Sequence, residues 1–327
     1  MSGRQTARAS RKGRESGDNP ILPFLRAQAV LVLDGGLATT LEARGFDLAD
    51  ELWSARLLLE APDAIRRVHR DFLVAGADCI ATASYQASLP GFRKRGLSER
   101  TAGELLRLSV RLAVSARDEF WNEKARRAGR LRPLVAASVG PYGAFLADGS
   151  EYTGDYGIGA AELDAFHRER WNILAGTEAD LLACETLPSR TEAEVLLGLL
   201  RETPGTWAWL SFSCRDEVHL HDGSRLAEVA KACDGEARVA AVGINCTSPK
   251  LIGPLIAEAR RGTDKPLFVY PNSGERYDAG RRTWTAGPGH VDWGKLVPMW
   301  VRAGARGVGG CCRVGPEEIG RIRRVVG

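Results

Sequence analysis

The chain has 327 residues, of which 44% are hydrophobic and 26% charged, values typical of a globular protein that can bury a sizeable core. Its formal net charge is only +4, from 45 basic and 41 acidic residues, so there is no large excess of positive charge for a nucleic-acid-binding face. No apolar run approaches the roughly 20 residues of a membrane span, and seven cysteines scattered over a long chain do not resemble a secreted disulfide framework, which favours a reducing cytoplasm.

The first 20 residues are more polar and more basic than the rest of the chain. Five Arg or Lys residues and two acidic residues give this segment a charge of +3 (5 − 2), and it lacks the apolar stretch of a secretory signal. We therefore expect residues 1–20 to be a disordered basic tail and residues 21–327 to form a single domain.

Eight short apolar runs follow the tail, and a longer amphipathic stretch follows most of them. The runs predict β-strands over Val30–Leu33, Cys79–Ala83, Leu134–Val139, Leu181–Cys184, Trp207–Ser213, Val239–Asn245, Leu267–Tyr270 and Arg306–Gly309. The longer stretches predict helices over Ala61–Ala75, Glu99–Ala128, Ala160–Ala175, Thr191–Arg201, Pro249–Arg261, Val291–Ala303 and Pro316–Val326. Eight strand–helix units at this length favour a closed (β/α)8 TIM barrel of the α/β class. An open doubly wound sheet is the alternative, although no GxGxxG fingerprint follows the first strand.

The reactive side chains of this chain are concentrated at the carboxyl ends of the predicted strands, where barrel active sites lie. In chain order they are Asp34 (followed by Gly35 and Gly36), Thr82, Tyr85, Glu185, Cys246, Cys311 and Cys312. The longest insert without a helical pattern, Tyr142–Gly159, follows the third strand. We expect it to be a loop over the mouth of the barrel, where binding loops usually lie.

Three of these side chains are thiols that the barrel would bring together. Cys246 ends the sixth strand, Cys311 and Cys312 end the eighth, and alternate strands share one layer of the barrel interior. Three thiolates favour zinc and leave a fourth position open, as in catalytic zinc sites. Neighbours in a strand point to opposite faces, so both Cys311 and Cys312 can bind one metal only if the chain bends after Gly309 and Gly310. The spacing alone leaves buried thiols or a vicinal disulfide as alternatives.

Simpler interpretations exist for several other residues. Asp34 before two glycines can be a turn former, and Trp53 can dock a surface helix by packing alone. His219 and His221 lie in a polar run that is typical of a solvated loop rather than of a metal site. Glu185 is harder to explain in this way, because an unpaired carboxylate after an apolar strand is costly to bury.

Eight ordered motifs between about Leu31 and Ile322 resemble those of the homocysteine S-methyltransferases. The motifs are DGGLATTLEARG, WSARLLLEAPDAIRRVHRDFLVAGAD, ATASYQAS, SVGPYGAFLADGSEYTGDY, LLACETLPS, GINCTSP, VYPNSGE and GGCCRVGPEEI. The resemblance is closer to the branch that uses S-methylmethionine as methyl donor than to betaine–homocysteine methyltransferase.

This resemblance implies a (β/α)8 barrel with a zinc ion at the carboxyl ends of its strands. Cys246, Cys311 and Cys312 would hold the zinc, and the homocysteine sulfur would supply the fourth ligand. Asp34 and Glu185 would bind the homocysteine ammonium. The thiolate, not the thiol, is the good nucleophile, and zinc makes a bound thiol lose its proton.

The resemblance also implies roles for residues around the two substrates. The backbone amides after Asp34, at Gly35, Gly36 and Leu37, would lie near the homocysteine carboxylate, and Thr82 would line the amino-acid pocket. Trp53 matches an aromatic residue that faces the cationic centre of the donor in the betaine enzymes. Tyr85 is a second aromatic residue that can hold a sulfonium by cation–π attraction.

The expected function is therefore transfer of a methyl group from S-methylmethionine, or from S-adenosylmethionine, to L-homocysteine, forming methionine. The polar loop residues Asp148, Glu151, Tyr152 and Asp155 are candidates for binding the donor's own amino and carboxyl groups. The alternatives are another donor such as betaine, another thiol or a selenol acceptor, a zinc hydrolase and a non-catalytic metal-binding protein. The expected partners are small molecules, with no nucleic acid and no membrane, for a monomer or a small homo-oligomer.

Overall fold

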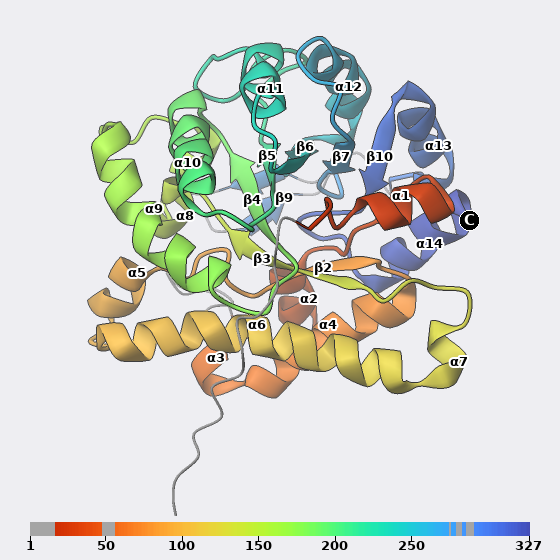
Figure 1. Cartoon of the computed structure of the whole chain (residues 1–327), viewed down its shortest axis with the longest axis horizontal. Helices are drawn as coiled ribbons and strands as arrows, with labels where there is room; N and C mark the ends of the chain where they lie inside the picture. Colours follow the sequence, from red (N-terminus) through yellow and green to blue (C-terminus); the bar gives the residue numbers. More distant parts are fainter. Residues whose placement is uncertain (1–16, 48–55, 275, 279–282, 286–290) are drawn as a thin grey trace, which may run out of the picture.

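Eight parallel strands form the centre of the molecule, and helices cover them on the outside (Figure 1). The computed structural model describes residues 17–47, 56–274, 276–278, 283–285 and 291–327. The strands are β1 (Leu31–Val32), β2 (Cys79–Ala81), β3 (Leu134–Val139), β4 (Leu181–Leu187), β5 (Ala208–Phe212), β6 (Val239–Asn245), β7 (Leu267–Tyr270) and β10 (Ala305–Val308). Their spatial order is β1-β10-β7-β6-β5-β4-β3-β2. An isolated parallel bridge between Leu33 and Cys79 joins the two ends of this order. The ring confirms the predicted (β/α)8 barrel and excludes the open doubly wound sheet.

The strands form where the sequence has continuous rather than alternating apolar runs. Every residue of β3 and of β6 is buried, because the barrel interior covers one face and the helices cover the other. The structure places β3, β6 and β7 over the residues predicted for them. Strand β4 continues to Leu187, three residues beyond the predicted end at Cys184.

The barrel interior is filled by a core of its own, in which small and large side chains alternate. Ala136 and Ala183 belong to it together with Trp209 and Phe268, whose ring centroids lie 5.6 Å apart. Gly307 of β10 lies beside the Phe268 ring, and a Cβ atom there would collide with it. The larger second core lies between the strands and the surrounding helices.

The amino-terminal end of the barrel is closed by the segment that precedes β1. The helix α1 (Leu22–Gln28) contributes Phe24 to the interior core, and Ile21 joins it. Asn19 donates a hydrogen bond from Nδ2 to the Ala240 carbonyl at 3.0 Å. Residues just before position 21 thus already contact the barrel.

The helices surround the barrel as Figure 1 shows. After α1 they are α2 (Leu37–Ala43), α3 (Leu57–Glu60), α4 (Pro62–Ala75), α5 (Leu89–Lys94), α6 (Glu99–Asn122), α7 (Lys124–Arg127), α8 (Tyr142–Leu146), α9 (Ala160–Ala175), α10 (Arg190–Glu202), α11 (Leu226–Asp234), α12 (Ile252–Arg260), α13 (Trp293–Ala303) and α14 (Pro316–Val326). Two 3-10 turns, η2 (Ser150–Tyr152) and η3 (Pro249–Leu251), and a hairpin of β8 (Arg276–Asp278) and β9 (Thr283–Thr285) complete the described elements. Within the described ranges, no helix combines the length and the apolar character that a bilayer span requires.

Most helix boundaries follow the sequence signals to within two residues. One exception is the helix predicted over Pro249–Arg261, which is divided into the turn η3 and the helix α12. Helices α9 and α14 occupy the predicted residues, and α4 begins at Pro62 and ends before Gly76, whose φ of +119° favours glycine. The helix predicted over Glu99–Ala128 instead breaks at Glu123, which separates α6 from α7. The insert Tyr142–Gly159 was expected to be non-helical, which is wrong: it contains the short α8 and the turn η2.

The seam between β1 and β2 is held mainly by one buried carboxylate. Asp78 is 1% exposed, and its backbone N–H donates to the Val32 carbonyl at 2.7 Å while its Oδ2 accepts from the Val32 N–H at 3.0 Å. Gln28 of α1 donates to the same Oδ2 at 2.5 Å. Arg130 at 3.2 Å and Arg323 of α14 donate to Oδ1. Asp78 therefore ties two helices, two strands and a loop together at the amino end of the barrel.

Candidate active site

A pocket lies at the opposite, carboxyl end of the barrel. It is lined by residues at or just after the carboxyl ends of the strands, among them Asp34, Thr82, Glu185, Cys246, Cys311 and Cys312. The strand ends predicted to carry reactive side chains thus meet in one cavity, as the barrel geometry requires.

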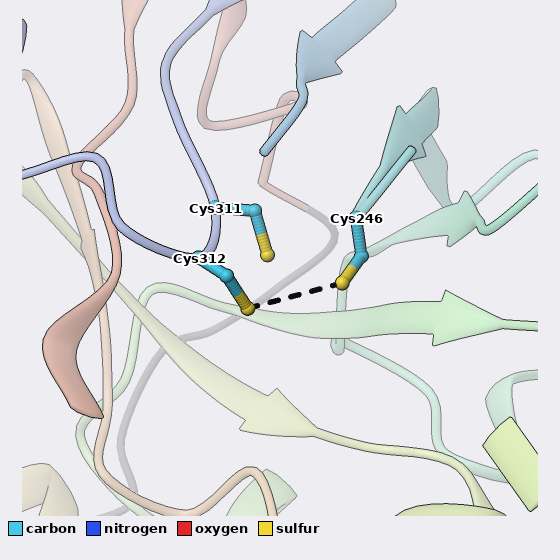
Figure 2. Close-up of side chains that lie close together, drawn as sticks. All are labelled: Cys246, Cys311 and Cys312. Atoms are coloured by element: carbon cyan, nitrogen blue, oxygen red, sulfur yellow. Dashed lines mark hydrogen bonds between the residues drawn. The ribbon is translucent and has the colours of Figure 1, made fainter. Parts of the chain in front are cut away.

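Three sulfur atoms from two distant segments face one another in this pocket. Cys246 follows β6, while Cys311 and Cys312 lie in the segment after β10, and Figure 2 shows the three side chains directed toward a common point. The three Sγ atoms lie within 4.8 Å of one another, with Cys246 Sγ and Cys312 Sγ 4.0 Å apart. Thiolates bound tetrahedrally to zinc at about 2.3 Å lie about 3.8 Å from each other. This cluster can therefore hold a metal ion with little movement.

The backbone around the thiols explains how they converge. Cys246 has a φ of +49°, a left-handed conformation that is costly for a residue other than glycine. Strand β10 ends at Val308, so Cys311 and Cys312 lie in a bend and not on opposite faces of a strand. The Cys311 N–H donates to the Pro271 carbonyl at 2.8 Å, and the Cys312 N–H donates to Asn272 Oδ1 at 3.2 Å. The loop after β7 thus fixes both cysteines.

The three thiols share their protons unequally. Hydrogen bonds from the Cys311 and Cys312 thiols hold the pKa of Cys246 well below its usual range, although burial opposes this shift. The same hydrogen bonds to Cys246 raise the pKa values of Cys311 and of Cys312. The hydroxyl of Tyr152 lies 3.4 Å from Cys246 Sγ. The cluster therefore favours a thiolate at Cys246, and thiolates are the form of cysteine that binds metals.

Two carboxylates form another wall of the pocket. Asp34 is 7% exposed and accepts the Ala81 N–H on Oδ2 at 2.8 Å, while Glu185 accepts the Ser138 hydroxyl on Oε1 at 2.5 Å. Burial raises the pKa of Asp34 well above its usual range, and burial raises the pKa of Glu185 to about 7. Among the described residues, no Lys or Arg forms an ion pair with either carboxylate. A cationic ligand in the pocket would supply the missing charge.

Thr82 and Tyr85, which the sequence also singled out, lie around these groups. Thr82 is buried, and its hydroxyl accepts the Ser138 N–H at 3.0 Å and contacts Ser84 Oγ at 2.6 Å, so it is occupied within the protein. The Tyr85 side chain lines the pocket, and burial raises the pKa of its phenol.

The Gly35–Gly36 pair and Trp53 complete this set. A Cβ atom at Gly35 would collide with the Val314 carbonyl, so the glycine allows the chain after β1 to pass close to the cysteine segment. The Gly36 N–H donates to the same carbonyl at 2.9 Å. Trp53 lies outside the described residues.

The insert between β3 and α9 brings a third carboxylate to the pocket. Glu151 and Tyr152 of η2 line the cavity, whereas Asp148 and Asp155 are exposed and do not. Glu151 is 9% exposed, and within the described structure its buried Oε2 has no hydrogen-bond partner. Burial raises the pKa of this carboxyl to about 7.

Two neighbours of the site were not found from the sequence. Tyr270, at the end of β7, accepts the indole N–H of Trp209 at 2.9 Å and lines the pocket together with Glu185. Its position at a strand end is a signal that could have identified it. His221 packs edge-on against the Tyr152 ring with centroids 5.9 Å apart. The expected solvated loop is thus partly buried at this residue, a contact that no local sequence pattern indicates.

Comparisons with known proteins identify relatives of the whole chain. Residues 31–326 match the family model described as homocysteine S-methyltransferase. The chain is 49% identical over 304 residues to homocysteine S-methyltransferase YbgG from Bacillus subtilis, covering 93% of this chain and 96% of that protein. It is 46% identical over 309 residues to selenocysteine Se-methyltransferase from Brassica oleracea var. italica, covering 90% of this chain and 88% of that protein.

A solved structure supports the same relationship in three dimensions. The metallated form of the homocysteine methyltransferase MmuM from Escherichia coli superposes with a TM-score of 0.84 at 46% sequence identity. The match covers 93% of this chain and 99% of that protein. Both the fold and nearly the full length are therefore shared.

Proposed function

We propose, because the chain belongs to the homocysteine S-methyltransferase family, that this enzyme transfers a methyl group from S-methylmethionine to L-homocysteine at a zinc site. The observation that carries the proposal is the convergence of three thiols, from Cys246, Cys311 and Cys312, beside carboxylates that have no cationic partner among the described residues. The products are two molecules of methionine, one from each substrate.

Zinc suits the sulfur cluster because a set of three thiolates is soft and leaves one tetrahedral position free. When bound, zinc would lower the pKa of the homocysteine thiol while leaving lone pairs on its sulfur for attack on a methyl group. The hydroxyl of Tyr152, 3.4 Å from Cys246 Sγ, can donate to that thiolate and so temper its charge.

The acceptor's ammonium would lie against Asp34 and Glu185. Both carboxylates are desolvated, so each gains strongly from a positive charge within hydrogen-bond reach. The Ala81 N–H donates to Asp34 and the Ser138 hydroxyl donates to Glu185, and these two hydrogen bonds fix the carboxylates before the substrate arrives. Of the backbone amides that follow Asp34, those of Gly35 and Leu37 are proposed to face the acceptor's carboxylate, whereas the Gly36 N–H is already donated to the Val314 carbonyl.

The donor would approach from the side of the insert between β3 and α9. Its sulfonium carries a positive charge that disappears as the methyl group leaves, since the electron pair of the broken C–S bond stays on the donor sulfur. No general base is then needed for this step. The Tyr85 ring, with Trp53 as a second candidate, would attract the sulfonium, and the free oxygen of Glu151 would accept from the donor's α-ammonium.

A selenol acceptor is a second candidate, because a relative with 46% identity is named selenocysteine Se-methyltransferase. The same site would bind a selenolate as it binds a thiolate. All seven cysteines are free thiols, which agrees with a reducing compartment, and we propose the cytoplasm.

Zinc analysis combined with homocysteine titration tests the metal proposal. The Cys246→Ala protein should lose its zinc and its turnover while keeping its fold, because two thiolates hold the metal far less tightly. Cys233→Ala is the matched control, since Cys233 is also a buried cysteine but lies on α11, outside the cluster. Stoichiometric zinc and normal turnover in Cys246→Ala would show that the site is misassigned.

Comparing methyl donors at a fixed homocysteine concentration tests the proposal that S-methylmethionine is the donor. S-methylmethionine should give a higher kcat/KM than S-adenosylmethionine or betaine. Glu151→Gln should raise the KM for S-methylmethionine about tenfold by removing one charge-assisted hydrogen bond, and Asp148→Asn, an exposed change in the same loop, should leave it unchanged. A clear preference for betaine would overturn this donor.

A further inference from the structure

A fully buried ionic cluster lies behind the insert that carries Glu151, outside the pocket itself. His167 and Arg170 of α9 and Glu192 of α10 are each no more than 1% exposed. None of the three lines the pocket. Buried charges are costly unless they are paired and hydrogen-bonded, so the bonds that this cluster makes indicate what it is for.

The hydrogen bonds of the cluster fix its protonation state. The Arg170 guanidinium donates to His167 Nδ1 at 2.8 Å, so Nδ1 carries no proton, and His167 Nε2 donates its proton to Glu192 Oε1 at 2.8 Å. The histidine is thus neutral, which agrees with the lowering of its pKa to about 4 by burial and by the Arg170 charge. The order is a cation, a neutral bridge and a carboxylate.

Arg170 and Glu192, on either side of the histidine, both bind the segment that follows β3. Arg170 donates to the carbonyl of Gly140, just before the insert. Glu192 Oε1 accepts the Tyr142 N–H at 2.6 Å, and Glu192 Oε2 accepts the Tyr156 hydroxyl at 3.0 Å. Glu192 therefore holds the insert near its beginning and near its end at the same time.

Packing inside the insert transmits this hold to its centre. The Tyr142 ring contacts the Tyr156 ring with centroids 5.4 Å apart, which brings the two ends together. A Cβ atom at Gly143 would collide with the backbone N of Glu151, so α8 and η2 pack backbone against backbone. Glu151 and Tyr152 then face the pocket from the far side of this unit.

We propose that Glu192 is a positioning residue for the methyl donor, acting by fixing the insert Tyr142–Gly159 over the pocket. This inference rests on the proposed function, in which Glu151 contacts the donor. Apolar residues would join α9 to α10 at lower cost than a buried carboxylate. The carboxylate is explained by the two bonds that it accepts from the insert, from Tyr142 and from Tyr156.

The test compares two variants that weaken the hydrogen bonds between Glu192 and the insert with two control variants that carry the same chemical change at another position. Tyr156→Phe removes the hydroxyl donated to Glu192 and keeps the ring, while Tyr142→Phe on the same insert removes a hydroxyl for which the described structure shows no hydrogen bond. Glu192→Gln keeps shape and removes charge. Its control is Asp180→Asn, a carboxylate that accepts from Arg117 and from the Val135 N–H at the amino end of the barrel.

Tyr156→Phe should raise the KM for S-methylmethionine about 3- to 10-fold, and Glu192→Gln should raise it further, with the KM for homocysteine and the zinc content unchanged. Amide hydrogen exchange of the insert Tyr142–Gly159, measured without substrates, should be faster in both variants than in the two controls. Unchanged donor KM and unchanged exchange in Tyr156→Phe and Glu192→Gln would overturn the proposal. The exchange measurement needs no donor, so it is independent of the proposed function. If the parent enzyme uses none of the tested donors, the proposed function is refuted. Faster exchange in Tyr156→Phe and Glu192→Gln would then still show that Glu192 holds the insert.

Discussion

Residues at the strand ends hold opposite kinds of chemistry on two sides of one pocket. The sulfur side collects three thiols around Cys246, and the carboxylate side places Asp34 and Glu185 where burial disfavours their charge. A ligand with a thiol at one end and an ammonium at the other fits both sides at once. The ammonium of such a ligand would supply the positive charge that no Lys or Arg of the described residues supplies to the two carboxylates.

Glu185→Gln should weaken homocysteine binding by roughly 1.5–3 kcal/mol, because the variant loses a charge-assisted hydrogen bond while it keeps the shape of the side chain. Calorimetric titration of the zinc-loaded enzyme measures the effect. Zinc content should stay the same. Equal homocysteine affinities in the variant and the parent would remove Glu185 from the acceptor site.

The homocysteine affinities of Glu185→Gln and of the parent should differ less at acidic pH. The raised pKa of Glu185, about 7, means that its carboxyl gains a proton as the pH falls through that value and then carries no charge, like glutamine. The ratio of the two homocysteine affinities should therefore shrink between about pH 8 and about pH 6. A ratio that stays constant over this range would show that the carboxylate charge does not act on the ligand.

The sequence indicated the thiols and the two carboxylates because each follows a recognisable apolar strand. Tyr270 carries the same strand-end signal and was overlooked. The sequence did not indicate His221 or Glu192, since their roles depend on contacts between segments that are distant in the chain. Glu192 in particular occupies a helix position that reads locally as an ordinary amphipathic residue. Pairing between elements, and not local pattern, gives it a role.

At the scale of elements, the two ends of the β1–β2 seam are each held by an aspartate. Asp78 holds the amino end through Val32, and Asp34 holds the carboxyl end through the Ala81 N–H and through its own N–H to the Cys79 carbonyl at 3.1 Å. Strand β1 spans only two residues. Side chains therefore supply hydrogen bonds that a longer ladder would have supplied.

Asp78→Asn should lower the free energy of unfolding by about 3–5 kcal/mol, because it leaves two partly buried arginines without their countercharge. Urea denaturation followed by fluorescence measures the loss. Asp63→Asn breaks a surface ion pair with Arg66 and should cost no more than about 1 kcal/mol. A similar small loss for Asp78→Asn would show that the seam does not depend on it.

Eight strands and the long helices were predictable because continuous apolar runs and 3.6-residue periodicity are local signals. The short elements α8 and η2 were not, since helices of five and three residues have little stability of their own. Here they are held by ring contacts such as Tyr142 with Phe166, 4.9 Å between centroids, and by the bonds to Glu192.

At the scale of the whole molecule, buried histidines make stability depend on pH. His69 of α4 is fully buried, neither ring nitrogen has a hydrogen-bond partner in the described structure, and burial lowers its pKa to about 3. Below its ordinary pKa of about 6.5 the unfolded chain binds a proton that the folded protein refuses. Acidification from about pH 6.5 toward pH 3 therefore favours unfolding through this group.

His69→Phe should remove that dependence. The raised pKa values of Asp34 and Glu185 act in the opposite direction, stabilising the fold at low pH, so the two proteins must be compared with each other rather than singly. The stability of the variant relative to the parent should rise by up to about 1.4 kcal/mol for each pH unit below about 6.5. Parallel stability curves from about pH 7 to pH 4 would contradict the assignment of a neutral buried histidine.

The pairing of β1 with β10 decides when the site can exist during folding. Leu31 of β1 pairs with Gly307 of β10, 276 positions away (307 − 31), whereas the neighbours from β2 to β7 pair in chain order. Contacts across such a separation close late, because their loop entropy must be overcome first. Asp34 and the Cys311–Cys312 segment both belong to this last closure. We expect zinc uptake during refolding to lag behind the burial of tryptophan, so that acquisition of the metal reports a finished barrel rather than a collapsed one.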